Sequence, residues 1–194
     1  IIRKIHLARC LENRDWDSIA SDLKKNQSEN FKHSSNKKMI YEKLKTYGLK
    51  VKDDLIKKNN SSHPASVSFW GSGTPLREFL HVDDLAEACI LLMKKSNKLL
   101  HQNNRFSNPN HINVGSGDEI LIKNLAYIVK EVVGFKGDIE FDNTYPDGTF
   151  RKLVCSKRIK DFGWRKKINL KDGINMVYNK YITDQKYSPL ILKV

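Results

Sequence analysis

The amino-terminal part of the chain places its apolar residues with the period of amphipathic helices. Residues 1–13 carry an apolar stripe that predicts a helix, formed by Ile2, Ile5, Ala8 and Leu11. Asp15 is suited to cap a second helix that ends near Leu23. Residues 24–38 are polar and predict a loop, whereas 39–58 return to helical spacing that Gly48 interrupts. We therefore expect 24–62 to be a mostly helical insertion outside the core, which follows a leading helix over 1–23.

The pattern changes after Pro64, where short apolar runs alternate with helical spacing. Strands are expected over 67–70, 77–82, 111–114 and 139–141, and helices over 121–133, 156–162, 170–182 and the stretch that follows Asp83. We expect Asp83 to be the N-cap of its helix and Gly134 to end the helix over 121–133. Strands that alternate with helices predict an α/β fold for the domain over 63–194.

The chain is basic, but its charge is spread along the sequence. Its 194 residues include 35 Lys and Arg against 22 Asp and Glu, a net charge of +13. Segments 1–62 and 63–194 carry about half of that excess each, mostly as lysine. Nucleic-acid interfaces usually concentrate arginine and aromatic residues in one stripe, so nucleic acid is not the expected partner. An anionic small molecule such as a nucleotide-sugar would suit the charge equally well.

Cysteines, histidines and apolar runs exclude several classes of protein. Cys10, Cys89 and Cys155 are far apart and form no CxxC motif, and the histidines show no metal-binding spacing, so neither a disulfide framework nor a metal site is expected. Reduced thiols favour a cytoplasmic protein. No run approaches the ~18 apolar residues of a membrane span, and no signal peptide is recognisable. The opening residues resemble the interior of a helix, so we expect an excised piece of a longer protein.

Two glycine pairs imitate a dinucleotide-binding fingerprint. Gly115 and Gly117 lie between a predicted strand and a predicted helix, but Ile120 occupies the third glycine position. Gly71 and Gly73 fail the same test at Leu76. A turn that needs a positive φ is therefore the preferred interpretation of both pairs.

Several motifs occur together in a characteristic order. They are the segment from Phe69 to Ala86 (FWGSGTPLREFLHVDDLA), His-Ile-Asn-Val-Gly-Ser-Gly at 111–117, Phe-Lys-Gly at 135–137, and the segment from Phe141 to Lys152 (FDNTYPDGTFRK). Over about 1–20 and 65–182 the chain resembles the GDP-L-fucose synthases, a family of extended short-chain dehydrogenases. Departures include Phe150, where the family pattern has proline, and Val154-Cys155, where a Leu/Met-Asp pair is usual.

The resemblance implies a two-part enzyme, of which this chain would be the carboxy-terminal substrate-binding part. The full protein would epimerise GDP-4-keto-6-deoxy-mannose and reduce it with NADPH, as a homodimer. The NADP-binding Rossmann part, the Tyr-x-x-x-Lys pair and the active-site His would lie outside this sequence, so we expect no catalytic, cofactor-binding or metal-binding residue here. Tyr41 and Lys45 match Tyr-x-x-x-Lys in spacing only, because they lie in the variable insertion.

Four residues match substrate-binding positions of the family. Trp70 could stack on a nucleobase or sugar, although a core Trp is the alternative. Arg77 could present a planar fork to a diphosphate, unless it pairs with Glu78 or Asp84.

The other two candidates have stronger structural alternatives. Asp147 could accept hydrogen bonds from sugar hydroxyls or guanine, but Pro-Asp-Gly also forms a turn by itself. Lys4 could supply charge without bidentate geometry, or lie on a solvated helix face. Arg151 and Lys152 are weaker candidates for phosphate contacts.

Two further interpretations stay open at this stage. The chain could belong to another nucleotide-sugar epimerase or dehydratase of the same superfamily. It could also be a non-catalytic basic module that binds nucleotide, nucleic acid or a protein.

Overall fold

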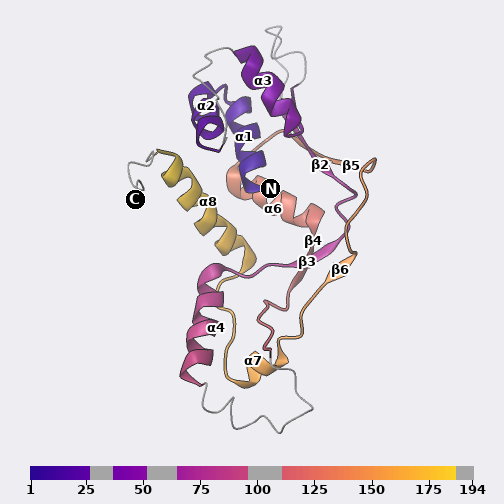
Figure 1. Ribbon diagram of the computed structural model, residues 1–194. Helices are drawn as coiled ribbons and strands as arrows, with labels where there is room; N and C mark the ends of the chain where they lie inside the picture. Colours follow the sequence, from indigo (N-terminus) through magenta and orange to yellow (C-terminus); the bar gives the residue numbers. More distant parts are fainter. Residues whose placement is uncertain (27–36, 52–64, 96–110, 187–194) are drawn as a thin grey trace.

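The structure, a computed structural model, describes residues 1–26, 37–51, 65–95 and 111–186. Its helices are α1 (Ile2–Glu12), α2 (Trp16–Lys25), α3 (Lys37–Thr46), α4 (Val82–Lys94), α6 (Ile122–Val133), α7 (Lys157–Asp161) and α8 (Leu170–Lys186). Its strands are β1 (Leu49–Val51), β2 (Ala65–Trp70), β3 (Leu76–Glu78), β4 (Glu119–Leu121), β5 (Asp138–Asp142) and β6 (Arg151–Lys152). Figure 1 shows an elongated arrangement, with α1, α2 and α3 at one end and α4 and α7 at the other. The mixed α/β class is therefore confirmed.

Two small sheets run through the described residues. The first has the order β1-β2-β5, with β1 antiparallel and β5 parallel to β2. Its register pairs Trp70 with Asp142, so the loops that leave β2 and β5 start side by side. The second sheet has the order β4-β3-β6 and pairs Arg77 with both Ile120 and Lys152.

The main hydrophobic core lies between the helices and the first sheet. Its buried residues come from α1, α2, α3, β1, β2, α6 and α8, and they include Leu7, Leu11, Leu23, Val67 and Val129. Each helix contributes one apolar stripe, and burial of such stripes is the main driving force for folding. The charged side chains of α2 are exposed apart from buried Asp22, whereas those of α1 are partly buried.

Capping signals in the sequence explain several helix ends. The backbone N–H of Ser18 donates to the Asp15 carboxylate (3.1 Å), which confirms Asp15 as the N-cap of α2. Gly134 ends α6 in the left-handed conformation (φ 77°), as expected. The cap of α4 was predicted wrongly: His81 is the N-cap, and its Nδ1 accepts from the backbone N–H of Asp83 (3.3 Å).

Three other expectations about the described residues are wrong. The helical spacing of 39–58 does not continue as a helix beyond Gly48, because Leu49–Val51 form β1 and pair with β2. Ile40, Leu44 and Leu49 are buried in the main core, so 37–51 does not lie outside it. Most of the predicted loop over 24–38 and the rest of the predicted helical stretch lie outside the described residues. The predicted strand over 111–114 does not form, since these residues pair with no described strand.

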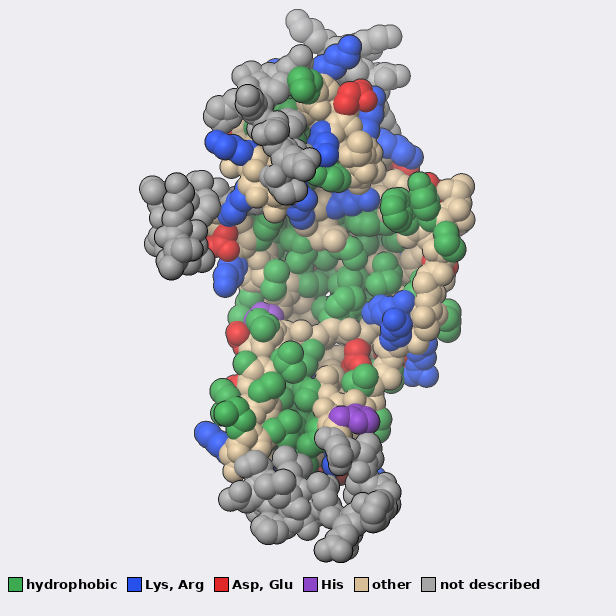
Figure 2. All heavy atoms as spheres, viewed as in Figure 1, with side chains coloured by type: hydrophobic (Ala, Val, Ile, Leu, Met, Phe, Trp, Pro, Cys, Tyr) green, Lys and Arg blue, Asp and Glu red, His purple; other side chains and the backbone are tan. Residues whose placement is uncertain are grey.

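Helix α4 has apolar residues on more than one face. Ala88 is buried with Ile159 and Trp164, whereas Val82, Leu85, Cys89 and Met93 share an exposed side. Figure 2 shows hydrophobic side chains gathered in the lower part of the visible face, where Figure 1 places α4. Among the described residues, no helix has the length and apolar character needed to cross a bilayer.

Candidate substrate-binding site

Trp70 lies at the carboxyl end of β2 and leaves most of its indole exposed. Its side chain is 72% accessible, so the alternative of a core Trp does not hold. The indole stacks on the ring of Tyr145, with centroids 4.5 Å apart and planes 11° apart. The sequence reasoning did not select Tyr145, whose only signal is an aromatic residue directly before Pro-Asp-Gly.

Asp147 joins the two loops on which these rings are carried. Its carboxylate accepts from the backbone N–H of Ser72 (2.8 Å) and from the Ser72 hydroxyl (2.5 Å). Gly71 has a φ of 81°, and a Cβ there would lie 2.4 Å from Asp147 Oδ1, so glycine is needed at this position. These contacts show Asp147 as a clamp between loops, whereas its contact with a substrate stays a prediction.

Lys4 reaches β2 from helix α1. Its ammonium donates to the carbonyl of Ser68 (2.5 Å) and lies 4.8 Å from the centre of the Phe69 ring. Burial lowers the pKa of Lys4 because desolvation disfavours the charged form. The side chain is half-buried beside the carboxyl-terminal part of β2, so the alternative of a freely solvated lysine does not describe it.

Arg77 has no acidic partner among the described residues. Its guanidinium donates to the carbonyl of Leu76 (2.6 Å), and one terminal nitrogen faces Gly148, next to Asp147. The two proposed rival partners are engaged elsewhere. Glu78 accepts from the backbone N–H groups of Gly117 and Val154, and Asp84 accepts from those of Lys167 and Ile168. Arg77 therefore keeps most of its donors for a ligand.

The four candidates form a connected group. Trp70 and Lys4 line the same cavity of about 300 Å³, together with Ile1, Arg3, Leu7, Thr46 and Tyr47. Asp147 is bonded to Ser72, two residues after Trp70, and Arg77 faces the glycine that follows Asp147. Arg151 is a poorer candidate, because it forms a bidentate ion pair with Glu119 (2.5 and 2.7 Å).

The loop at Gly115 and Gly117 does not suit a dinucleotide phosphate. The Glu78 carboxylate accepts from the Gly117 N–H (3.0 Å), and a Cβ on Gly115 would lie 2.6 Å from the same side chain. A carboxylate therefore occupies the place where a pyrophosphate would need the backbone donors. The left-handed conformation of Gly117 (φ 78°) supports the simple-turn interpretation.

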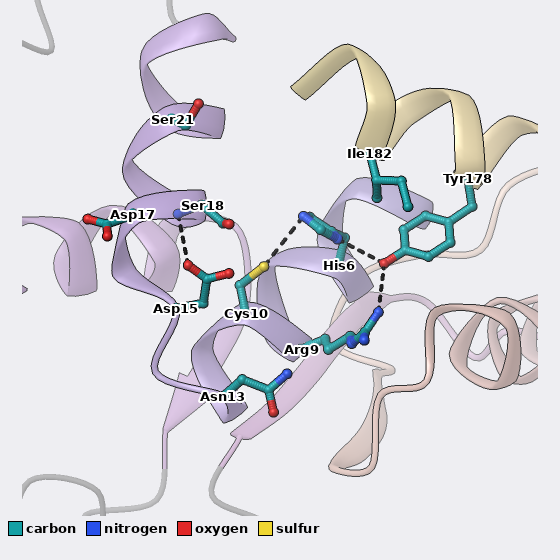
Figure 3. Close-up of a pocket in the computed structure, with 10 residues that line it drawn as sticks. All are labelled: His6, Arg9, Cys10, Asn13, Asp15, Asp17, Ser18, Ser21, Tyr178 and Ile182. Atoms are coloured by element: carbon teal, nitrogen blue, oxygen red, sulfur yellow. Dashed lines mark hydrogen bonds between the residues drawn. The ribbon is translucent and has the colours of Figure 1, made fainter. Parts of the chain in front are cut away.

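A second cavity of about 420 Å³ lies between α1, α2 and α8 (Figure 3). The Tyr178 hydroxyl bonds His6 Nδ1 (3.0 Å) and Arg9 (3.2 Å), and Cys10 Sγ lies 3.4 Å from His6 Nε2. Burial raises the pKa of Cys10 to about 12, so its thiol is a poor nucleophile. His6, Arg9, Cys10 and Tyr178 thus contact one another, and no cluster of potential metal ligands occurs among the described residues.

This chain is similar to known proteins that are named GDP-L-fucose synthases. Residues 45–115 match the model of the NAD dependent epimerase/dehydratase family. A putative GDP-L-fucose synthase 2 from Arabidopsis thaliana is 44% identical over 170 residues, covering 86% of this chain and 45% of that protein. The GDP-L-fucose synthase of Escherichia coli is 36% identical over 172 residues, covering 89% of this chain and 50% of that protein.

A solved structure is similar as well. A GDP-6-OMe-4-keto-L-xylo-heptose reductase from Campylobacter jejuni is 36% identical, with a TM-score of 0.75 over 94% of this chain and 46% of that chain. Sequence and fold together make the chain similar to the NAD dependent epimerase/dehydratase class of proteins. Within that class it is a homologue of the GDP-L-fucose synthases, and it spans about half the length of the curated relatives it matches.

Proposed function

We propose that the whole protein is an NADP-dependent GDP-L-fucose synthase and that this chain supplies its GDP-sugar-binding part. The full reaction would epimerise GDP-4-keto-6-deoxy-mannose at two carbons and reduce the ketone. The observation that carries the proposal is the grouping of Trp70, Lys4, Arg77 and Asp147 around the ends of β2 and β3, in a homologue of these synthases.

The geometry suggests a role for each group. The exposed indole of Trp70 offers a flat face to a nucleobase or sugar. Arg77, which has no acidic partner among the described residues, can donate two parallel hydrogen bonds to a diphosphate. Lys4 adds a nearby positive charge and is already fixed to the Ser68 carbonyl. Asp147 holds the loop that follows Trp70 through Ser72 and keeps acceptor capacity for a ligand donor.

The NADP-dependent chemistry belongs to other parts of the proposed enzyme. Bound NADPH would supply the hydride, but the Gly115–Gly117 loop of this chain is filled by Glu78 and does not fit the cofactor's phosphates. We therefore expect the chain to bind nucleotide without turning over the keto-sugar. A homodimeric assembly and a cytoplasmic location belong to the same proposal.

Calorimetric titration of the chain with GDP, UDP and inorganic pyrophosphate tests the proposal. GDP should bind more tightly than UDP, and Trp70→Ala should weaken GDP binding about 10-fold or more, as expected for loss of a stacking partner. Arg77→Ala should cause a loss of similar size.

Arg165→Ala is the matched control for Arg77, because Arg165 also donates to backbone carbonyls. It should leave GDP binding unchanged. Equal losses in the two arginine variants, or no GDP binding at all, would contradict the proposal. Tighter UDP binding would favour another nucleotide-sugar epimerase or dehydratase, and steeply salt-dependent RNA or DNA binding without any GDP effect would favour a nucleic-acid-binding module.

A further inference from the structure

We infer that Tyr145 is a positioning residue that holds the Trp70 indole flat, so that the two stacked rings form the platform for the nucleobase of the nucleotide. The inference rests on the proposed function and assigns a role to a residue that the family resemblance did not select. It begins from the near-parallel stack of the two rings, 4.5 Å between centroids and 11° between planes.

The stack lies at the surface and not in the core. Trp70 is 72% and Tyr145 42% accessible, and neither belongs to a buried cluster. Two exposed aromatic rings held parallel bury little area for the stability of the fold. Their arrangement instead leaves a wide, flat apolar surface beside charged groups, which suits a ligand with a planar ring and a phosphate.

The backbone on both sides of the stack is fixed by hydrogen bonds. The carbonyl of Asp142 accepts from the N–H groups of Gly71 (2.9 Å) and Tyr145 (3.3 Å), so the two loops leave the sheet together. Further along, the Asp147 carboxylate bonds Ser72. The loop that carries Tyr145 is therefore joined to the loop after Trp70 both before Tyr145, at Asp142, and after it, at Asp147. Its ring is consequently held against the indole before any ligand binds.

The surroundings indicate which side of the indole is available. Trp70 lines the cavity of about 300 Å³ that also contains Lys4, whereas Tyr145 is absent from the described residues lining it. Tyr145 thus supports the indole from outside this cavity. A base stacked on the free face of the indole would lie beside this cavity, with Lys4 near its phosphates. Rigid positioning in advance of binding lowers the entropic cost of association.

Fluorine NMR of the chain labelled with 5-fluorotryptophan tests the inference. Three resonances are expected, from Trp16, Trp70 and Trp164. The resonance that is lost in Trp70→Phe is assigned to Trp70. Tyr145→Ala should shift and broaden the Trp70 resonance, whereas Tyr145→Phe should preserve it because the ring is kept. Tyr127→Ala, at an exposed tyrosine of α6, is the matched control and should change nothing.

Titrations of the same variants with GDP and with inorganic pyrophosphate separate base contacts from phosphate contacts. Tyr145→Ala should weaken GDP binding about 3- to 10-fold, Tyr145→Phe should bind as the wild type does, and the affinity for pyrophosphate should not change in either. An unchanged Trp70 resonance in Tyr145→Ala, or an equal loss of pyrophosphate affinity, would overturn the inference. A wild-type chain that does not bind GDP would overturn the proposed function, and the Trp70 resonance would still show whether Tyr145 orders the indole.

Discussion

The two hydrophobic clusters of the molecule differ in how completely they are covered. The main core is enclosed by α1, α2, α3, α6, α8 and the first sheet, and Leu11 within it is fully buried. The second cluster buries Ala88, Ile159 and Trp164, while the exposed side of α4 carries Leu85 and Met93. A helix that is apolar on more than one side normally lies in a protein interior. The comparison indicates that the main core is larger and more completely covered than the second cluster.

The largest expected effect comes from a cavity in the main core. Leu11→Ala should lower the free energy of unfolding by about 2–5 kcal/mol, because the enclosed site cannot collapse around the lost methyl groups. Urea denaturation followed by circular dichroism measures the change. If this variant lost less than the α4 variants described below, the proposed contrast between the clusters would be wrong.

Each of the two regions contains one buried aspartate, and the two aspartates have different partners. Asp22 accepts from Arg3 (2.8 Å) and from the Tyr181 hydroxyl (2.5 Å), thereby joining α1, α2 and α8. Asp84 instead accepts from the backbone N–H groups of Lys167 and Ile168.

Asp22→Asn should cost about 2–3 kcal/mol of unfolding free energy, because it leaves the charge of Arg3 without its partner. Asp84→Asn should cost about 1–2 kcal/mol, because an amide can replace only one of the two acceptors. Urea midpoints at pH 7 measure both values, and the reverse order would contradict the assignment of a charge-paired role to Asp22 alone.

A pH effect is expected at the contact between α1 and α8. Burial lowers the pKa of His6, an effect that the positive charge of Arg9 reinforces and that Asp22 and Asp15 oppose. His6 therefore becomes protonated at a lower pH in the folded state than in the unfolded state, where it titrates near its ordinary pKa of 6.5. Stability should be full above that value and should fall as the pH drops through it, until the folded-state pKa is reached.

Thermal unfolding between pH 7.5 and 5 measures this slope, with His6→Gln as the comparison. The variant should show a shallower slope over this interval. An equal slope in both proteins would assign the pH dependence to other groups.

The smallest stability effect is expected on the exposed side of α4. Leu85→Lys and Met93→Lys should change the free energy of unfolding by no more than about 0.5 kcal/mol, since both side chains already contact solvent. They should also reduce self-association, measured by light scattering, because they interrupt an apolar patch. A loss of stability comparable to that of Leu11→Ala would show that this side of α4 is covered.

The sequence predicted the elements whose signals are local. The stripe of Ile2, Ile5, Ala8 and Leu11 indicated α1, Asp15 indicated the start of α2, and Gly134 indicated the end of α6, because periodicity and capping act within one or two turns of helix. The motifs around Trp70 and Asp147 likewise indicated the family, which the relatives confirm. Local pattern therefore predicted the fold class and most helices, whereas the candidate site residues came from the resemblance to the family.

Only the tertiary structure decided how distant segments meet. Leu49–Val51 form a strand because β2 is available to pair with them, whereas 111–114 form no strand and pair with none of the described strands. The stack of Trp70 on Tyr145 and the clamp from Asp147 to Ser72 join residues about 75 positions apart. A strand needs a neighbour to complete its hydrogen bonds, and a binding site needs its groups at fixed distances. Neither requirement is encoded in local spacing, so the amino-acid pattern predicted most helices, whereas the packing of the chain decided which strands form and how distant residues pair.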